Sequence, residues 1–221
     1  MTGLSENPPG NLPELSADLI AQLFCTDPTV GFALCDINGT VLYVNDRSAE
    51  LFIQGKPEDG LGKTLNELLG EEWAAERLDM FERITESRKP ILSRHILHGR
   101  QIQSTIRVLT EQGADNPVFS ILSSEGVHDP SDPAAFEVVE SKLISLGPLD
   151  ALTRREIEVL ALIGHGMTSK QIAAMLHRSV RTIAQHADSL RGKLNGATRV
   201  QIAEFARAAC LELTDAELTR L

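Results

Sequence analysis

The sequence feature that most constrains the fold is a run of closely spaced helix starts between residues 152 and 211. Thr153-Arg-Arg-Glu156 and Thr198-Arg-Val-Gln201 both have the pattern of a capping box, which begins a helix. Thr168 and Ser179 are two further N-cap candidates. Each start opens one short helix, and only short polar or glycine-containing breaks separate one helix from the next. The segment therefore predicts four short helices that pack closely together.

The third of these helices, from Ser179 to about Leu194, has one apolar face and one polar face. Ile183, Leu190 and Leu194 recur at spacings of seven and four, which places them on one side of a helix of 3.6 residues per turn. A capped helix with a short polar face that follows another short helix across a tight turn suits the major groove of DNA. We therefore expect an all-α, four-helix helix-turn-helix domain that binds DNA.

Charge is distributed unevenly along the chain. The 221 residues carry a net charge of −10, yet residues 151–221 contain 10 Lys/Arg and only 7 Asp/Glu. Residues 1–150 contain 11 Lys/Arg and 24 Asp/Glu. This asymmetry is expected of a regulatory domain joined to a nucleic-acid-binding domain. The small basic excess predicts modest and strongly salt-dependent affinity for non-specific DNA.

Cysteine usage and hydropathy indicate a cytoplasmic protein. Cys25, Cys35 and Cys210 are too few and too scattered for a disulfide framework or a zinc site, and we expect no metal. The polar N-terminal residues do not have the pattern of a signal peptide. No apolar stretch approaches the ~20 residues that a membrane span requires, so we expect no membrane association.

No nucleophile elbow, P-loop or His-Glu-x-x-His motif is present, and we expect no enzymatic activity.

The first part of the chain predicts a leader, a helix and a hairpin. Residues 1–14 are expected to be disordered, because they are rich in Pro and Gly and lack hydrophobic periodicity. Leu15 to Phe24 predicts an amphipathic helix. Two apolar runs then flank Asn38-Gly39, a dipeptide typical of a type I′ hairpin turn. A short helix capped by Asn45 or Asp46 is expected to follow.

The next part predicts helices and then strands. The capping box Thr64-Leu-Asn-Glu67 begins a short helix, and a longer helix covers about 71–89, with Trp73, Leu78, Phe81 and Ile84 as its apolar face. Strands are expected at 91–97, 101–109 and 117–123, with a hairpin at His98-Gly99-Arg100. The order predicts an α+β fold with an antiparallel sheet and helices on one face. Residues 136–146 fit both a strand and a helix.

These elements, with Leu34-Cys-Asp-Ile-Asn-Gly-Thr-Val-Leu-Tyr-Val-Asn45 leading into Ser48-Ala-Glu-Leu-Phe52, resemble a PAS domain over roughly residues 15–125. The resemblance implies a sensor or dimerisation module with a cavity between sheet and helices. No cofactor is evident, because the flavin-binding Asn-Cys-Arg-Phe motif is missing and residues 71–89 contain no haem-binding His. We expect His95 and His98 to be ordinary surface or hairpin residues and Cys35 to be a small core residue.

Four motifs in the C-terminal part carry a second resemblance. Leu152-Thr-x-Arg-Glu-x-Glu-Val-Leu160, Gly166-Met-Thr-Ser-Lys-Gln-Ile-Ala173, Ser179-x-x-Thr-Ile-x-x-His186 and Lys193-Leu194 resemble, in order and spacing, the LuxR-type (GerE/NarL-like) DNA-binding domain. The resemblance covers about 60 residues. It implies a dimeric transcription factor whose third helix enters the major groove and whose fourth helix supports dimerisation.

Carried over position by position, the resemblance implies ten DNA-contacting residues: Lys170, Ser179, Arg181, Thr182, Ala184, Gln185, His186, Asp188, Lys193 and Arg199. Ala184, Gln185 and Asp188 occupy base-reading positions; the Gln185 amide suits adenine, and Asp188 can accept a hydrogen bond from cytosine N4. The other residues are candidates for phosphate contacts, and His186 is equally a candidate for helix packing.

We therefore predict a leader (1–14), a PAS-like sensor domain (15–125), a linker with an extra strand or helix (126–149), a helix-turn-helix domain (150–211) and a C-terminal tail (212–221). The predicted function is sequence-specific transcriptional regulation by a homodimer on double-stranded DNA, with the PAS-like domain sensing a small-molecule signal or mediating dimerisation. The alternative is an antagonist that does not bind DNA and heterodimerises with a partner regulator. The sequence leaves the signal, the operator and the sign of regulation open.

Overall fold

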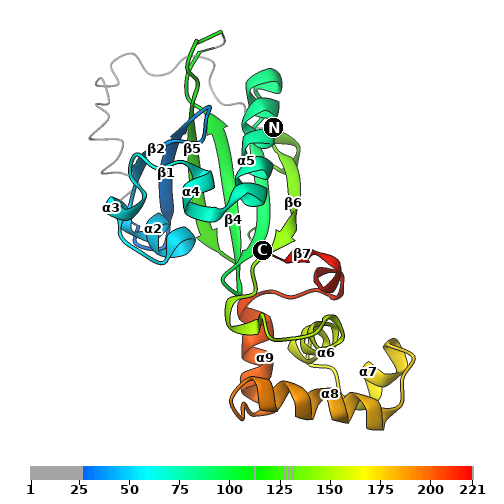
Figure 1. Cartoon of the computed structure of the whole chain (residues 1–221). Coiled ribbons are helices and arrows are strands. Elements are labelled where there is room, and N and C mark those ends of the chain that lie inside the picture. Colours follow the sequence, from blue (N-terminus) through cyan, green and yellow to red (C-terminus); the bar gives the residue numbers. More distant parts are fainter. Residues whose placement is uncertain (1–26, 112, 127, 129, 131, 221) are drawn as a thin grey trace.

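A computed structural model describes residues 27–111, 113–126, 128, 130 and 132–220 of the chain (Figure 1). The expected leader, the helix expected from Leu15 to Phe24, and Cys25 lie outside these residues. The described elements follow one another as β1 (Gly31–Asp36), β2 (Val41–Val44), α2 (Asp46–Ile53), α3 (Pro57–Gly60), α4 (Leu65–Leu69), α5 (Glu71–Ser87), β3 (Ile91–Leu97), β4 (Arg100–Val108), β5 (Val118–Glu125), η1 (Pro133–Ala135), β6 (Glu137–Ile144), η2 (Gly147–Leu149), α6 (Arg154–Gly164), α7 (Ser169–Met175), α8 (Val180–Lys193), α9 (Arg199–Ala208), η3 (Leu213–Glu217) and β7 (Thr219–Arg220).

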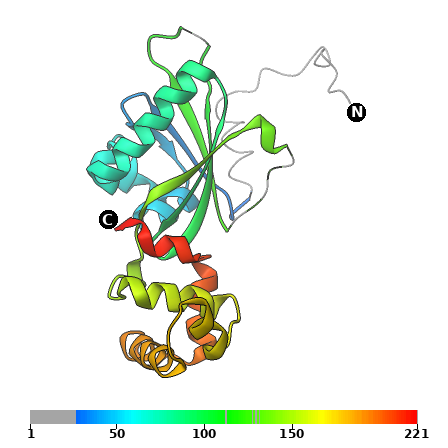
Figure 2. The same cartoon turned by 90° about the vertical axis from the view of Figure 1, so that its right-hand side faces the viewer.

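The strands form one mixed sheet in the order β2-β1-β5-β4-β3-β6-β7. The first five strands pair antiparallel, as expected, and helices α2 to α5 cover one face of the sheet (Figure 2). The antiparallel sheet expected for residues 15–125 is thus confirmed, and two parallel strands extend it beyond that segment, because β6 pairs with β3 in parallel and β7 pairs with β6 in parallel. The segment that fitted both strand and helix is a strand, since the open edge of β3 provides backbone partners for β6.

The core of the sheet domain contains the predicted apolar face of α5. Trp73, Phe81 and Ile84 are buried there, and Leu78 is partly buried against the same cluster. The ring of Phe81 stacks on that of Phe119 in β5, with 4.3 Å between centroids. This packing holds the helical layer on the sheet.

The first of the two expected hairpin turns differs from the sequence expectation, and the second is confirmed. Asn38-Gly39 is not a type I′ turn, because only Gly39 has a positive φ, of 78°. The Asp36 carboxylate closes this turn instead, accepting hydrogen bonds from the backbone N–H groups of Asn38 (2.9 Å) and Thr40 (2.8 Å). In the second hairpin, both turn residues have a positive φ, His98 at 52° and Gly99 at 73°.

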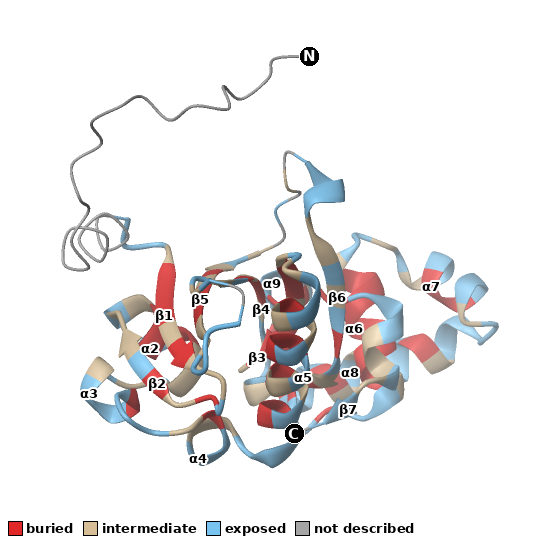
Figure 3. Ribbon diagram, turned by 90° about the horizontal axis from the view of Figure 1, so that it is seen from above, coloured by how far each residue is buried: buried red, intermediate tan, exposed pale blue. Residues whose placement is uncertain are grey.

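The four C-terminal helices pack through the faces that the spacing predicted. Ile157, Leu160 and Ala161 of α6 are buried with Ile183 and Leu190 of α8. Figure 3 shows buried segments, in red, on both helices. Residues from α7 and α9 complete this core, among them Ile172, Ala173, Ile202 and Ala206.

The chain returns to the sheet after α9, where we expected only a tail. Strand β7 pairs with β6, and Glu217 of η3 forms an ion pair with Arg154 of α6. On the sheet side, Ile96 and Ile144 belong to the same buried cluster as α6. The helical domain is thus held against the sheet through both the segment that precedes α6 and the segment that follows α9.

The His98-Gly99 turn gives a stability prediction. Gly99 lies at φ +73°, and a Cβ there would lie 2.7 Å from the backbone oxygen of Leu146, in the segment leading to α6. Gly62 lies at φ +77° with no atom within 4 Å of a Cβ. Replacing either glycine by Ala places an L-residue in the left-handed region, which costs about 1–2 kcal/mol. Only Gly99→Ala also brings the new Cβ against a backbone oxygen.

We therefore expect Gly99→Ala to lower the free energy of unfolding by at least about 1 kcal/mol more than Gly62→Ala, as measured by urea titration. Equal losses in the two variants would show that the turn does not press against the Leu146 backbone.

Candidate functional site

Helices α7 and α8 form the centre of the candidate DNA-binding site. Thr168 caps α7 in a capping box with Gln171, and Ser179 caps α8 by accepting a hydrogen bond from Thr182 N (3.0 Å). Between the helices His177 adopts a left-handed φ of 52°, which lets the chain reverse direction within a few residues. Short polar caps and this tight turn therefore fix the angle at which α8 leaves α7.

The outward face of α8 carries the three residues assigned to base reading, Ala184, Gln185 and Asp188, and the phosphate candidate Arg181. Arg181, Ala184, Gln185 and Asp188 are all exposed. Among the residues that the structure describes, the polar side chains of this group form no hydrogen bond or ion pair. Thr182 and His186 are half-buried at the margin of the same helix, and Lys170 is exposed near the start of α7. The structure thus leaves a polar stripe along α8 open to a partner.

Two basic residues near this stripe were missed in the sequence analysis. Arg191 is exposed and lies three residues after Asp188, which places it at the far end of the same helical face. Arg178 is exposed immediately before the Ser179 cap. The three-residue spacing from Asp188 could have identified Arg191. We name Arg181, Ala184, Gln185, Asp188 and Arg191 the α8 outer stripe.

Lys193 and Arg199 are placed differently from the expectation of free phosphate-binding cations. The ammonium of Lys193 lies 2.7 Å from Glu156 Oε2 and donates a hydrogen bond to the carbonyl oxygen of Ala151 (2.9 Å). Arg199 Nη2 donates to the carbonyl oxygen of Met167 (2.6 Å). Both cations hold parts of the helical domain together.

Glu156 connects α6 to α8 through a dense set of hydrogen bonds. Glu156 is only 3% exposed. Its carboxylate accepts hydrogen bonds from Thr153 N (2.7 Å), Ser189 Oγ (2.6 Å) and Lys193 Nζ (2.7 Å). Burial raises the pKa of Glu156, but the hydrogen bonds from Lys193, Ser189 and Thr153 outweigh burial and lower the pKa to about 2. The carboxylate is therefore charged at neutral pH and positions α8.

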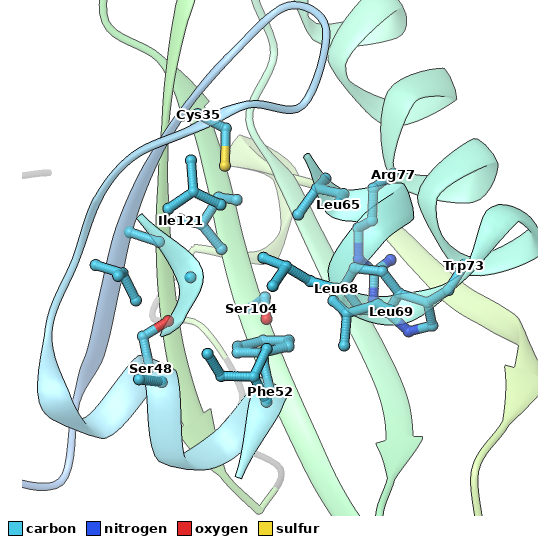
Figure 4. Close-up of a pocket in the computed structure, with 16 residues that line it drawn as sticks. Cys35, Ser48, Phe52, Leu65, Leu68, Leu69, Trp73, Arg77, Ser104 and Ile121 are labelled. Atoms are coloured by element: carbon cyan, nitrogen blue, oxygen red, sulfur yellow. The ribbon is translucent and has the colours of Figure 1, made fainter. Parts of the chain in front are cut away.

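A cavity lies between the sheet and helices α2 to α5 (Figure 4). Its lining is mostly apolar and includes Cys35, which is 1% exposed, as expected of a core residue. Burial, aided by Asp36, raises the pKa of the Cys35 thiol to about 12, so the thiol is protonated. The charged residue of the lining is Arg77 of α5.

The expectation for His95 as a surface or hairpin residue is wrong. His95 is 4% exposed, and its ring lies 5.7 Å from that of Trp73 and 5.8 Å from that of Phe52. It is buried because β3 directs its side chain toward the helical layer, on the same face as Ser93. His98, by contrast, lies in the hairpin as expected.

Two further properties concern only the described part of the chain. There, no group of three or more His, Cys, Asp or Glu side chains is arranged to hold a metal ion. In the same residues, no helix has both the length and the apolar character needed to cross a membrane.

Comparison with known families supports both resemblances. Residues 150–206 match the family described as "Bacterial regulatory proteins, luxR family", and residues 29–119 match the family described as "PAS fold". The chain therefore carries a PAS-fold domain followed by a luxR-family helix-turn-helix domain.

Curated relatives match over short segments of the chain. The transcriptional regulatory protein LiaR of Bacillus subtilis is 37% identical over 59 residues, which cover 27% of this chain and 28% of LiaR. The nitrate/nitrite response regulator protein NarP of Escherichia coli is 42% identical over 53 residues, 24% of this chain and 25% of NarP. The matches thus span little more than a quarter of these relatives.

Two solved structures have remote similarity to this chain. The VqmA–ligand–DNA complex from Vibrio cholerae aligns with 90% of this chain and 91% of its own, at 18% identity and a TM-score of 0.45. The PAS domain of BvgS from Bordetella pertussis aligns with 53% of this chain and 88% of its own, at 21% identity and a TM-score of 0.39.

The Glu156 cluster gives a pH-dependent prediction. A carboxyl group with a lowered folded-state pKa adds stability above its unfolded pKa of about 4.3, and that stability is lost as the pH falls toward 2. We expect Glu156→Gln to lower the free energy of unfolding by about 2–3 kcal/mol at pH 7, and the difference from the wild type to shrink between pH 5 and pH 3.

Urea titrations across this pH range measure the effect, with Glu204→Gln on the exposed side of α9 as the matched control. A difference that stays constant with pH would rule out the charge of Glu156 as the cause.

Proposed function

We propose that the protein is a sequence-specific, DNA-binding transcriptional regulator that acts as a homodimer. The observation that carries the proposal is the α8 outer stripe, which is exposed on a capped helix within a luxR-family domain. Two recognition helices in a dimer would lie about one DNA turn apart, ~34 Å, on a two-fold-related site. We further infer that the protein is cytoplasmic and has no enzymatic activity.

The exposed residues suggest separate roles at the DNA surface. Gln185 and Asp188 would read base edges, with Ala184 allowing close approach to the groove. Arg181, Arg191 and Lys170 would pair with phosphates, together with the polar α8 start at Ser179 and Thr182. His186, half-buried, would contact phosphate or pack against the domain. We assign Lys193 and Arg199 to positioning, because both already bond within the domain.

The PAS-fold domain would control this output through β6. Glu76 of α5 accepts hydrogen bonds from Ser141 Oγ (2.7 Å) and Lys142 N (2.9 Å) on β6, and β6 leads through η2 into α6. A change around α5 therefore has a short physical route to the helix-turn-helix domain.

Exposed apolar residues on α9 favour assembly through this helix. Val200 is 65% exposed and Phe205 is 39% exposed. A homodimer that buries these residues fits the proposal. The alternative, an antagonist that heterodimerises through the same helix, would show no duplex binding at low salt but would associate with a partner regulator.

The first test of DNA binding concerns phosphate contact. Operator duplexes are first selected from a random pool, and binding to the selected duplex is titrated at several salt concentrations. We expect Arg181→Ala to weaken binding to all duplexes and to lower the slope of log K against log salt by about one unit per protomer.

Lys89→Ala, which removes an exposed cation from the sheet domain, is the matched control. Equal effects of the two substitutions would assign the electrostatic contribution to net charge rather than to α8.

The second test concerns sequence reading. We expect Gln185→Ala to relax specificity at one base pair per half-site by about 1–3 kcal/mol while leaving the salt slope unchanged. The measurement is a titration of the selected duplex and its single-base variants. An unchanged preference at every position would remove Gln185 from the base-reading set.

A further inference from the structure

The cavity of the PAS-fold domain combines an apolar lining with one buried cation. Arg77 is 2% exposed and lines the cavity together with apolar side chains such as Leu65, Leu68 and Ile121. Figure 4 shows its guanidinium extending from α5 toward the indole of Trp73, and the guanidinium carbon lies 4.1 Å from the ring centroid. A buried charge in such surroundings requires compensation.

The hydrogen bonds of Arg77 leave part of its guanidinium unused. Nη1 donates to Ser93 Oγ (3.1 Å), and Nη2 lies 2.9 Å from His95 Nδ1. Among the described residues, Nε donates no hydrogen bond and Nη2 has no second acceptor. Nε–H and one N–H of Nη2 share one edge of the planar group, which is the geometry that binds a carboxylate through two bonds.

His95 supports this arrangement. Since a guanidinium only donates hydrogen bonds, His95 Nδ1 accepts, and the ring proton therefore resides on Nε2. Burial and the Arg77 charge lower the pKa of His95 well below its ordinary value, so the ring is neutral. Nε2 is buried and, within the described part of the chain, has no partner. The cluster thus has spare donors and no spare acceptor.

The carboxylate nearest to Arg77 is already bonded elsewhere. Glu76 Oε2 lies 3.4 Å from Arg77 Nη1, longer than a strong charge-assisted hydrogen bond. The same carboxylate accepts the shorter bonds from Ser141 and Lys142 of β6. Glu76 therefore compensates the Arg77 charge only in part.

The size of the cavity limits what can enter it. The volume open to the centre of a water-sized sphere is about 50 Å³. Since one water needs about 10–15 Å³ by this measure, the cavity holds roughly three to five groups of that size. A short alkyl chain with one acidic group fits these limits.

We propose that this cavity binds a short-chain carboxylate, whose oxygens pair with the unused edge of Arg77 and whose alkyl chain lies against the apolar lining. The proposal rests on the sensor role proposed for the PAS-fold domain, and it names the chemical class of the signal. Binding would also draw Arg77 away from Glu76, which holds β6.

The test uses the full chain and butyrate, with butyramide and n-butylammonium as neutral and cationic analogues of the same length. Trp73 lines the cavity and is the single tryptophan of the chain, so its fluorescence reports on the site. We expect butyrate to change the Trp73 emission saturably and to bind at least about tenfold more tightly than butyramide. Sodium chloride at equal ionic strength is the control.

Arg77→Gln should abolish the preference for butyrate over butyramide, and the wild-type titrations decide the matter if this variant does not fold. Equal affinity for butyrate and butyramide, or no saturable response to butyrate, would overturn the proposal. A chain that binds its selected duplex without responding to butyrate would lose this inference and keep the proposed function. A chain that binds butyrate but no duplex would keep this inference and lose the proposed function.

Discussion

The buried carboxylate of Glu156 is the interaction on which the arrangement of the helix-turn-helix domain depends. It completes the capping box at the start of α6 and at the same time binds Ser189 and Lys193 of α8. An unpaired buried carboxylate would be expensive, so the hydrogen bonds of this cluster form together. One side chain thereby couples the start of the first helix of the domain to the C-terminal half of the helix that we propose reads DNA.

The second organising constraint is the open edge of β3. Strand β6 pairs with β3 in parallel along this edge and then leads into α6. Strand β7, which follows α9, pairs in parallel with β6. The apolar side chains of Ile96 and Ile144 continue the core of the helical domain into the sheet. The connection between the two domains is consequently a packed strand rather than a loose linker, which gives the proposed sensor domain a direct physical route to the helix-turn-helix domain.

The two domains differ in how far hydrogen bonds and opposite charges compensate their buried charge. Around Glu156, four donor groups converge on one carboxylate and lower its pKa to about 2, so the charge is fully compensated. Around Arg77, burial lowers the pKa of the guanidinium to about 10, and the attraction of Glu76 only partly opposes this. A buried charge whose hydrogen bonds are all made rigidifies its surroundings, whereas Arg77 keeps the unused donors on which the proposed carboxylate site rests. The contrast separates a structural cluster from a candidate binding site.

The sequence by itself determined the helices, the caps and the apolar faces, because these depend on residues three or four positions apart; Thr153, Thr198 and the Ile183–Leu190 spacing are examples. It also determined which positions of α8 are exposed, since the opposite face must be buried. Only the tertiary structure decided that Lys193 and Arg199 bond within the domain, that His95 is buried beside Arg77, and that residues 137–144 extend the sheet in parallel. Each of these outcomes depends on a partner at least eighteen residues away in sequence, and no local pattern specifies which distant segment will supply it.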